Sequence, residues 1–181
     1  MAKVRQNIVI HGLSGQLGDE LVVRQDKAGR TIVSAKAPAD PNRQFTDMQI
    51  AHQEQFREAT GYAKAAKGEE VYVEKAKGTP MTPYNVAVAD WFHEPEIKEI
   101  DLSGWNGQAG QTICIEAMDD VQVKQVTVVI TDENDAVLEQ GSAVQAEGLW
   151  WNYTTTQAAS GTPKVIASAQ DLPGHIAKMT K

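Results

Sequence analysis

The segment VQVKQVTVVITDENDAVLEQG, residues 121–141, decides the fold of the chain around it. Val126, Val128 and Ile130 alternate with their neighbours in the period-two pattern of a half-buried strand. The acidic run 132–135 is typical of a turn, and the residues after it begin a return strand. The segment therefore predicts a β-hairpin inside an antiparallel sheet.

Strand signals recur on both sides of this hairpin, every 8–12 residues from position 96 onward, with Gly, Asn and Asp in the breaks. Seven short strands at this spacing predict an immunoglobulin-like β-sandwich over residues 96–181. The expected strands are 97–102, 112–117, 123–131, 136–146, 149–155, 164–169 and 175–179.

Residues 1–95 carry different signals and form a second predicted unit. Extended runs at 7–10, 21–24 and 31–34 are separated by glycines, and the last two predict a hairpin. Helices are expected after a cap at Thr46 or Asp47, over 69–77, and over 83–92 after the start signal Thr82-Pro83. The predicted class is α+β: a β-hairpin and two to three helices, then the sandwich.

Composition and charge narrow the function classes. The chain has 181 residues, of which 41% are hydrophobic and 23% charged, as in globular proteins. Residues 1–95 are neutral, so the whole net charge of −7 lies in residues 96–181, which disfavours nucleic acid as a partner. No apolar run is long enough for a membrane span. Cys114 is the single cysteine, so no internal disulfide is expected.

The N-terminal residues lack the features of a secretory signal. We expect synthesis in the cytoplasm, while the final location, including leaderless export or incorporation into a particle, stays unknown.

Five segments of the C-terminal half resemble bacterial immunoglobulin-like repeats: TICIEAMDD (112–120), VTVVITD (126–132), VLEQG (137–141), WWNYT (150–154) and ASAQDLPGH (167–175). The last is similar to their closing Ala-x-Asp-x-x-Gly-Asn signature, with His175 in place of asparagine and Pro173 before the glycine. The resemblance covers about residues 97–179 and implies the fold, whereas function does not follow from it because that fold serves adhesion, spacing and assembly alike.

The N-terminal half is similar to a second pattern, found in uncharacterised bacterial proteins of unknown function. The similar segments are GLSGQLG (12–18), QIAHQEQF (49–56) and TPYNVAVAD (82–90). Gly12, Gly15 and Gly18 lack the Lys-Ser/Thr of a phosphate loop, and Ser14 lacks the Gly-x-Ser-x-Gly spacing of a nucleophile elbow. We interpret these glycines as turn residues and as candidates for an interaction surface.

Acidic residues at the predicted strand ends suggest one metal hypothesis. Carboxylates that converge at a sandwich tip could bind Ca²⁺, although Asp in such places more often bonds its own backbone in a turn. The four histidines have no ligand at metal-site spacing, and we expect no cofactor. The Ca²⁺ candidates are Asp119, Asp120, Asp132, Asp135 and Asp171.

Trp150, Trp151 and Tyr153 form an aromatic strand and are interaction candidates. Adjacent residues of a strand face opposite sides, so one tryptophan should leave the core. It would then cover the helical part near Trp91, or contact a protein or carbohydrate.

No set of residues at catalytic spacing is present, so we expect that the protein is not an enzyme. The leading hypothesis is a structural or protein-interaction module that self-associates through N-terminal strands such as 7–10 and 21–24 in a homo-oligomeric, filamentous, phage-like or cell-surface assembly. The alternative is a small-ligand or carbohydrate-binding module that uses sandwich loops and an exposed tryptophan.

Overall fold

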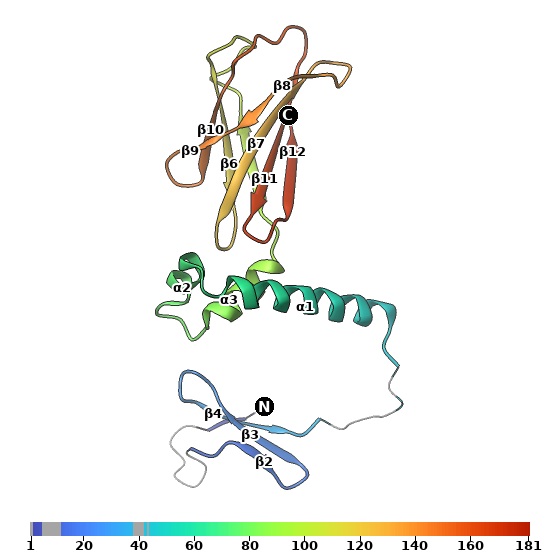
Figure 1. Cartoon of the computed structure of the whole chain (residues 1–181), viewed down its shortest axis with the longest axis vertical. Coiled ribbons are helices and arrows are strands. Elements are labelled where there is room, and N and C mark those ends of the chain that lie inside the picture. The colour runs from blue at the N-terminus through green and yellow to red at the C-terminus, as the bar shows by residue number, and fades with distance from the viewer. Residues whose placement is uncertain (1, 5–11, 38–41, 43) are drawn as a thin grey trace.

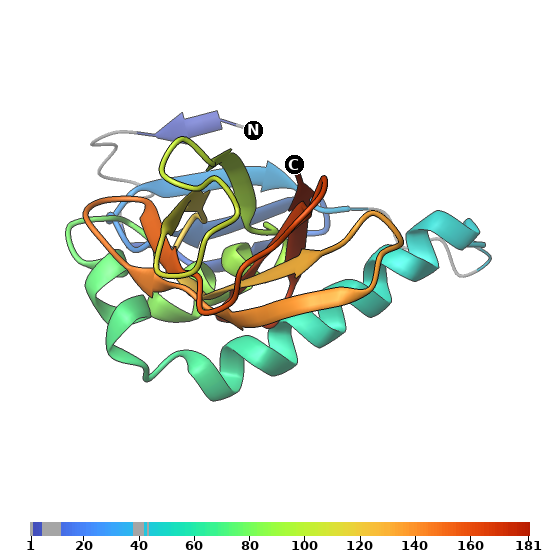
Figure 2. The ribbon, with the colours of Figure 1, turned by 90° about the horizontal axis from the view of Figure 1, so that it is seen from above.

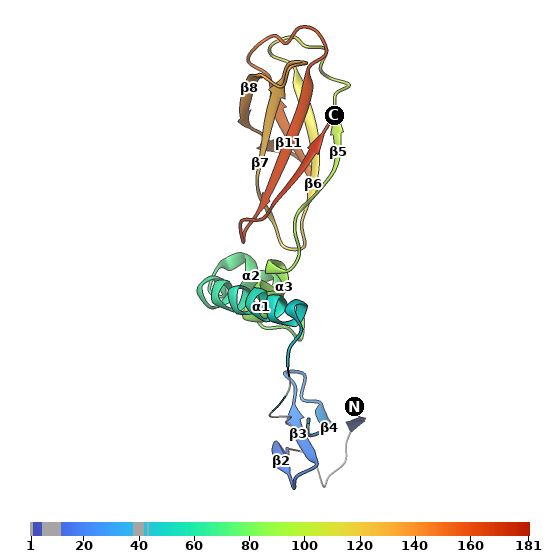
Figure 3. The same cartoon turned by 90° about the vertical axis from the view of Figure 1, so that its right-hand side faces the viewer.

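The computed structural model describes residues 2–4, 12–37, 42 and 44–181. Figures 1 and 3 show three layers along the long axis: a small N-terminal sheet, a layer of helices, and a larger β unit that carries the C-terminus. The predicted α+β class is confirmed. No helix in the described ranges is both long and apolar enough to cross a membrane.

The C-terminal unit is a β-sandwich of two four-stranded antiparallel sheets. One sheet has the order β5-β6-β10-β9, and the other has the order β12-β11-β7-β8. The strands are β5 (Glu96–Asp101), β6 (Thr112–Met118), β7 (Val123–Thr131), β8 (Val137–Ser142), β9 (Val144–Gln145), β10 (Trp150–Thr154), β11 (Lys164–Asp171) and β12 (Ile176–Thr180). The single strand expected over 136–146 is in fact two, because the chain leaves β8 at Ser142 and begins β9 at Val144.

The hairpin that decides the fold contributes an inner strand, β7, and an edge strand, β8, to its sheet. β7 pairs with β8 on one side and with β11 on the other, with Val128 opposite both Gly141 and Ala167. Val126, Val128 and Ile130 are each at most 1% exposed and belong to one core of 15 buried residues. The alternation in the sequence thus corresponds to the inward face of the central strand.

The helical layer contains α1 (Asp47–Ala66), α2 (Glu70–Ala76) and α3 (Pro83–Trp91). Thr46 caps α1 in a capping box with Gln49, and Thr82 caps α3 by accepting from the amide of Asn85. Both starts are those that the sequence predicts. The layer has a small core of six buried residues: Ala63, Ala66, Tyr72, Ala76, Val86 and Ala87.

The N-terminal sheet contains β1 (Ala2–Val4), β2 (Gly15–Leu17), β3 (Leu21–Gln25) and β4 (Thr31–Ala35), in the order β1-β4-β3-β2. The predicted hairpin of β3 and β4 is confirmed. Two expectations need correction. First, the glycine-rich run 12–18, interpreted as a turn, contains the strand β2. Second, residues 21–24, predicted to pair with another copy, have no free edge, because β3 pairs with both β4 and β2. The predicted strand 7–10 lies outside the described residues.

Residues 12–37 and the start of α1 bury little apolar surface. Within 12–37 the buried residues are Val23 and Thr31, whereas Leu17 is 54% exposed. All residues of α1 from 47 to 58 are exposed, including Met48 at 85%. In Figure 2 this half of α1 extends beyond the rest of the structure. The N-terminal end therefore presents apolar side chains that the described residues do not cover.

Gly141 provides a test of packing in the sandwich. A Cβ atom there would lie 2.7 Å from Cε2 of Tyr153, whose ring is buried and whose hydroxyl donates to the buried Glu139. Burial and the hydrogen bond to Glu139 keep this ring from moving away from a new methyl group. We therefore expect Gly141→Ala to lower the free energy of unfolding by about 1–3 kcal/mol.

Gly61→Ala is the matched control, since Gly61 lies in α1 with open space around it. It should raise the free energy of unfolding by about 0.5–1 kcal/mol. Urea unfolding of both variants measures the two signs, and a Gly141→Ala protein as stable as wild type would contradict the packing argument.

Candidate functional site

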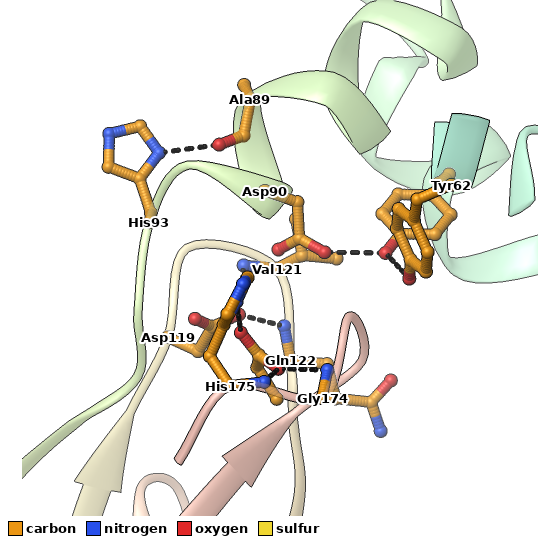
Figure 4. Close-up of polar contacts among 11 residues, drawn as sticks. Tyr62, Ala89, Asp90, His93, Asp119, Val121, Gln122, Gly174 and His175 are labelled. Carbon is orange, nitrogen blue, oxygen red and sulfur yellow. Dashed lines mark hydrogen bonds and ion pairs between the residues drawn. The ribbon is translucent and has the colours of Figure 1, made fainter. Parts of the chain in front are cut away.

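The most unusual polar cluster lies where the helical layer meets two loops of the sandwich (Figure 4). Its centre is Asp90, near the end of α3, which is 1% exposed. The Tyr72 hydroxyl donates to Asp90 Oδ2 at 2.5 Å, and the hydroxyls of Tyr72 and Tyr62 lie 2.6 Å apart. One residue from each helix thus joins a buried chain of hydrogen bonds.

Asp90 lies in an environment that disfavours its charge. Burial is the largest cause, and the nearby carboxylates of Asp119 and Asp171 add to it, while the Tyr72 hydroxyl opposes them. Together they raise the pKa of Asp90 to about 6. Burial and the hydrogen bond to Asp90 also raise the pKa of Tyr72. Asp90 Oδ1 is buried and has no hydrogen-bond donor.

The first sandwich loop, between β6 and β7, brings Asp119 to the cluster. Asp119 Oδ2 accepts from the backbone amides of Val121 and Gln122, both at 3.0 Å, which fixes the loop. Its other oxygen, Oδ1, is buried without a donor, like Asp90 Oδ1. In the same loop Asp120 forms an exposed ion pair with His93, with 2.9 Å between Oδ2 and Nδ1.

The second loop, between β11 and β12, is organised by Asp171, which is fully buried. Its Oδ1 accepts from the amides of Gly174 and His175, both at 2.6 Å, and its Oδ2 lies 2.8 Å from His175 Nδ1. The imidazole of His175 in turn meets the Trp91 ring edge to face, with centroids 5.4 Å apart. Asp171 therefore orients a histidine toward the last residue of α3.

Apolar contacts complete the junction. Val121 and Leu172, one from each loop, pack against the helical core that contains Tyr72. Beside them is a cleft of about 320 Å³, lined by Lys75, Thr79, Met81, Val86, Ala89, Asp90, Asp120 and Val121. Both sandwich loops are thus anchored on the helices by buried apolar and polar groups together.

The five calcium candidates do not converge. Asp119, Asp120 and Asp171 lie at the junction, whereas Asp132 and Asp135 lie in the β7–β8 turn at the other end of β7. Asp132 accepts from the amides of Asn134 and Ala136, and Asp135 pairs with Lys164. Across the described ranges, no group of three or more His, Cys, Asp or Glu side chains is arranged to hold a metal ion.

The aromatic strand divides between the two faces of its sheet. Trp151 and Tyr153 are buried in the sandwich core at 7% and 5% exposure, and Trp150 is half-buried on the other face. The ring contacts of Trp91 are with Phe92 and His175, so His175 takes the place expected for a tryptophan of this strand.

Tyr153 also donates to Glu139, a buried carboxylate that accepts from the Thr156 amide and hydroxyl and from the Gln157 amide. Burial opposes its charge, but these donors outweigh burial and lower the pKa of Glu139. The aromatic strand is therefore tied to the 155–157 loop.

Gly12, Gly15 and Gly18 lie apart from the junction, in and around β2. Their φ angles are 84°, 120° and 63°, and a Cβ atom at any of them would meet nothing within 4 Å. Backbone conformation, rather than a close neighbour, accounts for glycine there.

Neither Asp90 nor Tyr72 stands out as a site residue in the amino-acid sequence. One signal was present: an acidic residue in the last turn of an apolar helix, where the helix dipole disfavours negative charge. Tyr72 has no such signal, because its role depends on the packing of α2 against α3.

Comparisons with known proteins do not assign a family. No protein-family model and no curated protein matches the chain. Among solved structures, the chain is similar to CopC from Methylosinus trichosporium, with 16% identity and a TM-score of 0.37 over 48% of this chain and 88% of that one.

Two further solved structures are similar over comparable parts of this chain. An engineered protein matches with 18% identity and a TM-score of 0.37 over 55% of this chain and 26% of that one. A conjugative transposon lipoprotein from Bacteroides eggerthii matches with 10% identity and a TM-score of 0.27 over 49% of this chain and 93% of that one.

Tyr72→Phe tests the buried chain of hydrogen bonds. It removes the donor to Asp90 Oδ2 while keeping the ring, so we expect a loss of about 1–3 kcal/mol in the free energy of unfolding. Tyr84→Phe on α3 is the control, because the Tyr84 hydroxyl is not among the hydrogen bonds that link Tyr62, Tyr72 and Asp90. Equal stabilities of the two variants in urea unfolding would show that the Tyr72 hydrogen bond contributes nothing.

Proposed function

We propose that this chain is a non-enzymatic structural or protein-interaction subunit that associates with further copies of itself through its N-terminal end. One observation carries the proposal: a four-stranded sheet in which residues 12–37 bury only Val23 and Thr31. A small sheet needs an apolar face packed against another element to be stable. A second copy of the chain would supply that cover.

The side chains available for this contact are apolar and close together in sequence. Leu13, Leu17 and Leu21 of the sheet region are 40–54% exposed. On α1, Met48, Ile50 and Phe56 are 85%, 44% and 50% exposed. Exposed apolar side chains concentrated in one region are typical of association surfaces.

Charge supports a head-to-tail arrangement. Residues 1–45 contain seven Lys or Arg and four Asp or Glu, a net of +3, whereas residues 96–181 carry −7. The described residues 12–37 of the first segment and the sandwich lie at opposite ends of the long axis in Figure 1. Attraction between the basic end of one copy and the acidic end of the next favours a heterologous contact, which builds rings or filaments.

We further infer that the C-terminal sandwich is immunoglobulin-like. Its two sheets, β5-β6-β10-β9 and β12-β11-β7-β8, match strands A-B-E-D and G-F-C-C′ of that fold in order and direction of pairing. Within the assembly we assign it the role of a rigid acidic end.

Sedimentation velocity at micromolar concentration tests the proposed association. We expect oligomers in 50 mM NaCl and fewer in 500 mM NaCl, because salt screens attraction between exposed charges. Leu17→Lys, on the edge strand β2, should weaken association about tenfold or more, since an edge lysine opposes pairing with another chain.

Val73→Lys is the control variant, since Val73 is 37% exposed on α2, in the helical layer between the two ends. It should associate like wild type. A wild-type protein that stays monomeric at all concentrations and salt levels would refute the proposal, and an equal loss in Leu17→Lys and Val73→Lys would show that the N-terminal sheet is not the contact.

A further inference from the structure

Two buried carboxylate oxygens at the junction lack a hydrogen-bond partner. Asp90 Oδ1 and Asp119 Oδ1 are both buried, and neither has a hydrogen-bond donor. The carboxylate of Asp119 lies near enough to Asp90 to raise its pKa. Two ionised carboxylates are acceptors only, so a hydrogen bond between them requires a proton on one of them. A single proton shared by the two groups would satisfy both oxygens.

We propose that Asp90 and Asp119 share one proton, and that this proton is a pH-sensitive latch between the helical layer and the sandwich. Asp90 belongs to α3 and Asp119 to the β6–β7 loop, so the bond crosses the boundary between two units that residues 92–95 connect. When the proton leaves, two like charges face each other in a buried site, and the contact weakens.

The other oxygen of each carboxylate already accepts hydrogen bonds, so only the two unpaired oxygens remain to share a proton. Tyr72 of α2, backed by Tyr62 of α1, occupies the other oxygen of Asp90, and two backbone amides occupy the other oxygen of Asp119. From the β11–β12 loop, Asp171 adds negative charge.

The remaining charged groups near the pair have partners of their own or lie at the rim. Asp171 pairs with His175, and Asp120 pairs with His93 at the surface. Lys75 lines the adjoining cleft together with Asp90 and Asp120. Glu69 adds negative charge near Tyr62. Within the described residues no metal-holding group competes for the two free oxygens.

The sign of the pH effect follows from the raised pKa. The pKa of Asp90 is about 6 in the folded chain against 3.8 ordinarily, so the protonated form favours folding. Its stabilising effect is complete below pH 3.8 and is lost as the pH rises through 6. Between pH 5 and 8 this group alone should raise the unfolding equilibrium constant about tenfold.

Asp90→Asn is the decisive variant. An asparagine amide can accept from Tyr72 and donate to Asp119 Oδ1, so it reproduces the protonated pair at every pH. We expect this variant to be more stable than wild type at pH 8 and to lack the tenfold change between pH 5 and 8. Asp119→Asn, which can donate to Asp90 in the same way, should behave alike and provides a second variant.

Asp135→Asn is the matched control. Asp135 is 75% exposed on its side chain, lies at the far end of the sandwich, and has a φ of 62° that asparagine tolerates. Its pH dependence in urea unfolding should equal that of wild type. Carbon-13 NMR of the Asp90 carboxyl group gives a direct readout, with a titration midpoint near 6.

Three results would overturn the proposal. The first is that Asp90→Asn and Asp119→Asn retain the pH dependence of wild type, or are less stable than wild type at both pH 5 and pH 8. The second is an Asp90 carboxyl signal that titrates near 4. The third is a rise in the unfolding midpoint of wild type, but not of Asp90→Asn, in 5 mM CaCl₂ or MgCl₂ at pH 8, which would assign the pair to a cation.

Discussion

The burial of Asp90 is the constraint on which the middle of the molecule depends. A carboxyl group that is 1% exposed must be paired or protonated, because an isolated charge in such a place is very costly. Tyr72 satisfies one oxygen, which ties α2 to α3, and the sandwich loop with Asp119 closes the other side. Acidic groups of both units thus meet at this boundary, and Val121 and Leu172 add apolar contact area.

Burial decreases from the C-terminus to the N-terminus. The sandwich has a core of 15 buried residues, and the helical layer has six. Residues 12–37 bury only Val23 and Thr31. Because burial of apolar area is the main favourable term in folding, this order is also the expected order of local stability. The N-terminal sheet, expected to be the least stable layer, is therefore the one that a partner would stabilise most by covering its apolar surface.

Local patterns predicted much of the fold. The alternation around Val128 identified the central strand, and Thr46 and Thr82 marked helix starts, because each signal involves neighbours within a few residues. β2 was missed because a three-residue strand that begins with the positive-φ Gly15 and is followed by Gly18 carries no strand pattern. The internal position of β3 depends on pairing with β2, which local patterns do not encode.

The candidate site was the least predictable part. Asp90, Asp119 and Asp171 come from three segments that meet only after the sandwich docks on the helices. Turn chemistry correctly indicated that Asp119 and Asp132 would bond nearby amides, because an Asx turn is a local interaction. The sharing of a site by two acidic groups requires the tertiary fold, and no spacing in the sequence signals it.

The junction and the ends are coupled through geometry. In a head-to-tail assembly the same rotation and translation relate each copy to the next. This operation depends on the angle between the N-terminal sheet and the sandwich within one copy. Asp90 and Asp119 lie at the boundary that sets part of this angle. A small change there is repeated at every copy, so a closed ring or a filament of fixed pitch demands a junction that is held by more than apolar contacts. Directional hydrogen bonds at Tyr72, Asp119 and Asp171 fix α2 against α3 and fix the two sandwich loops, so the surfaces that meet at the junction are held in shape on both sides.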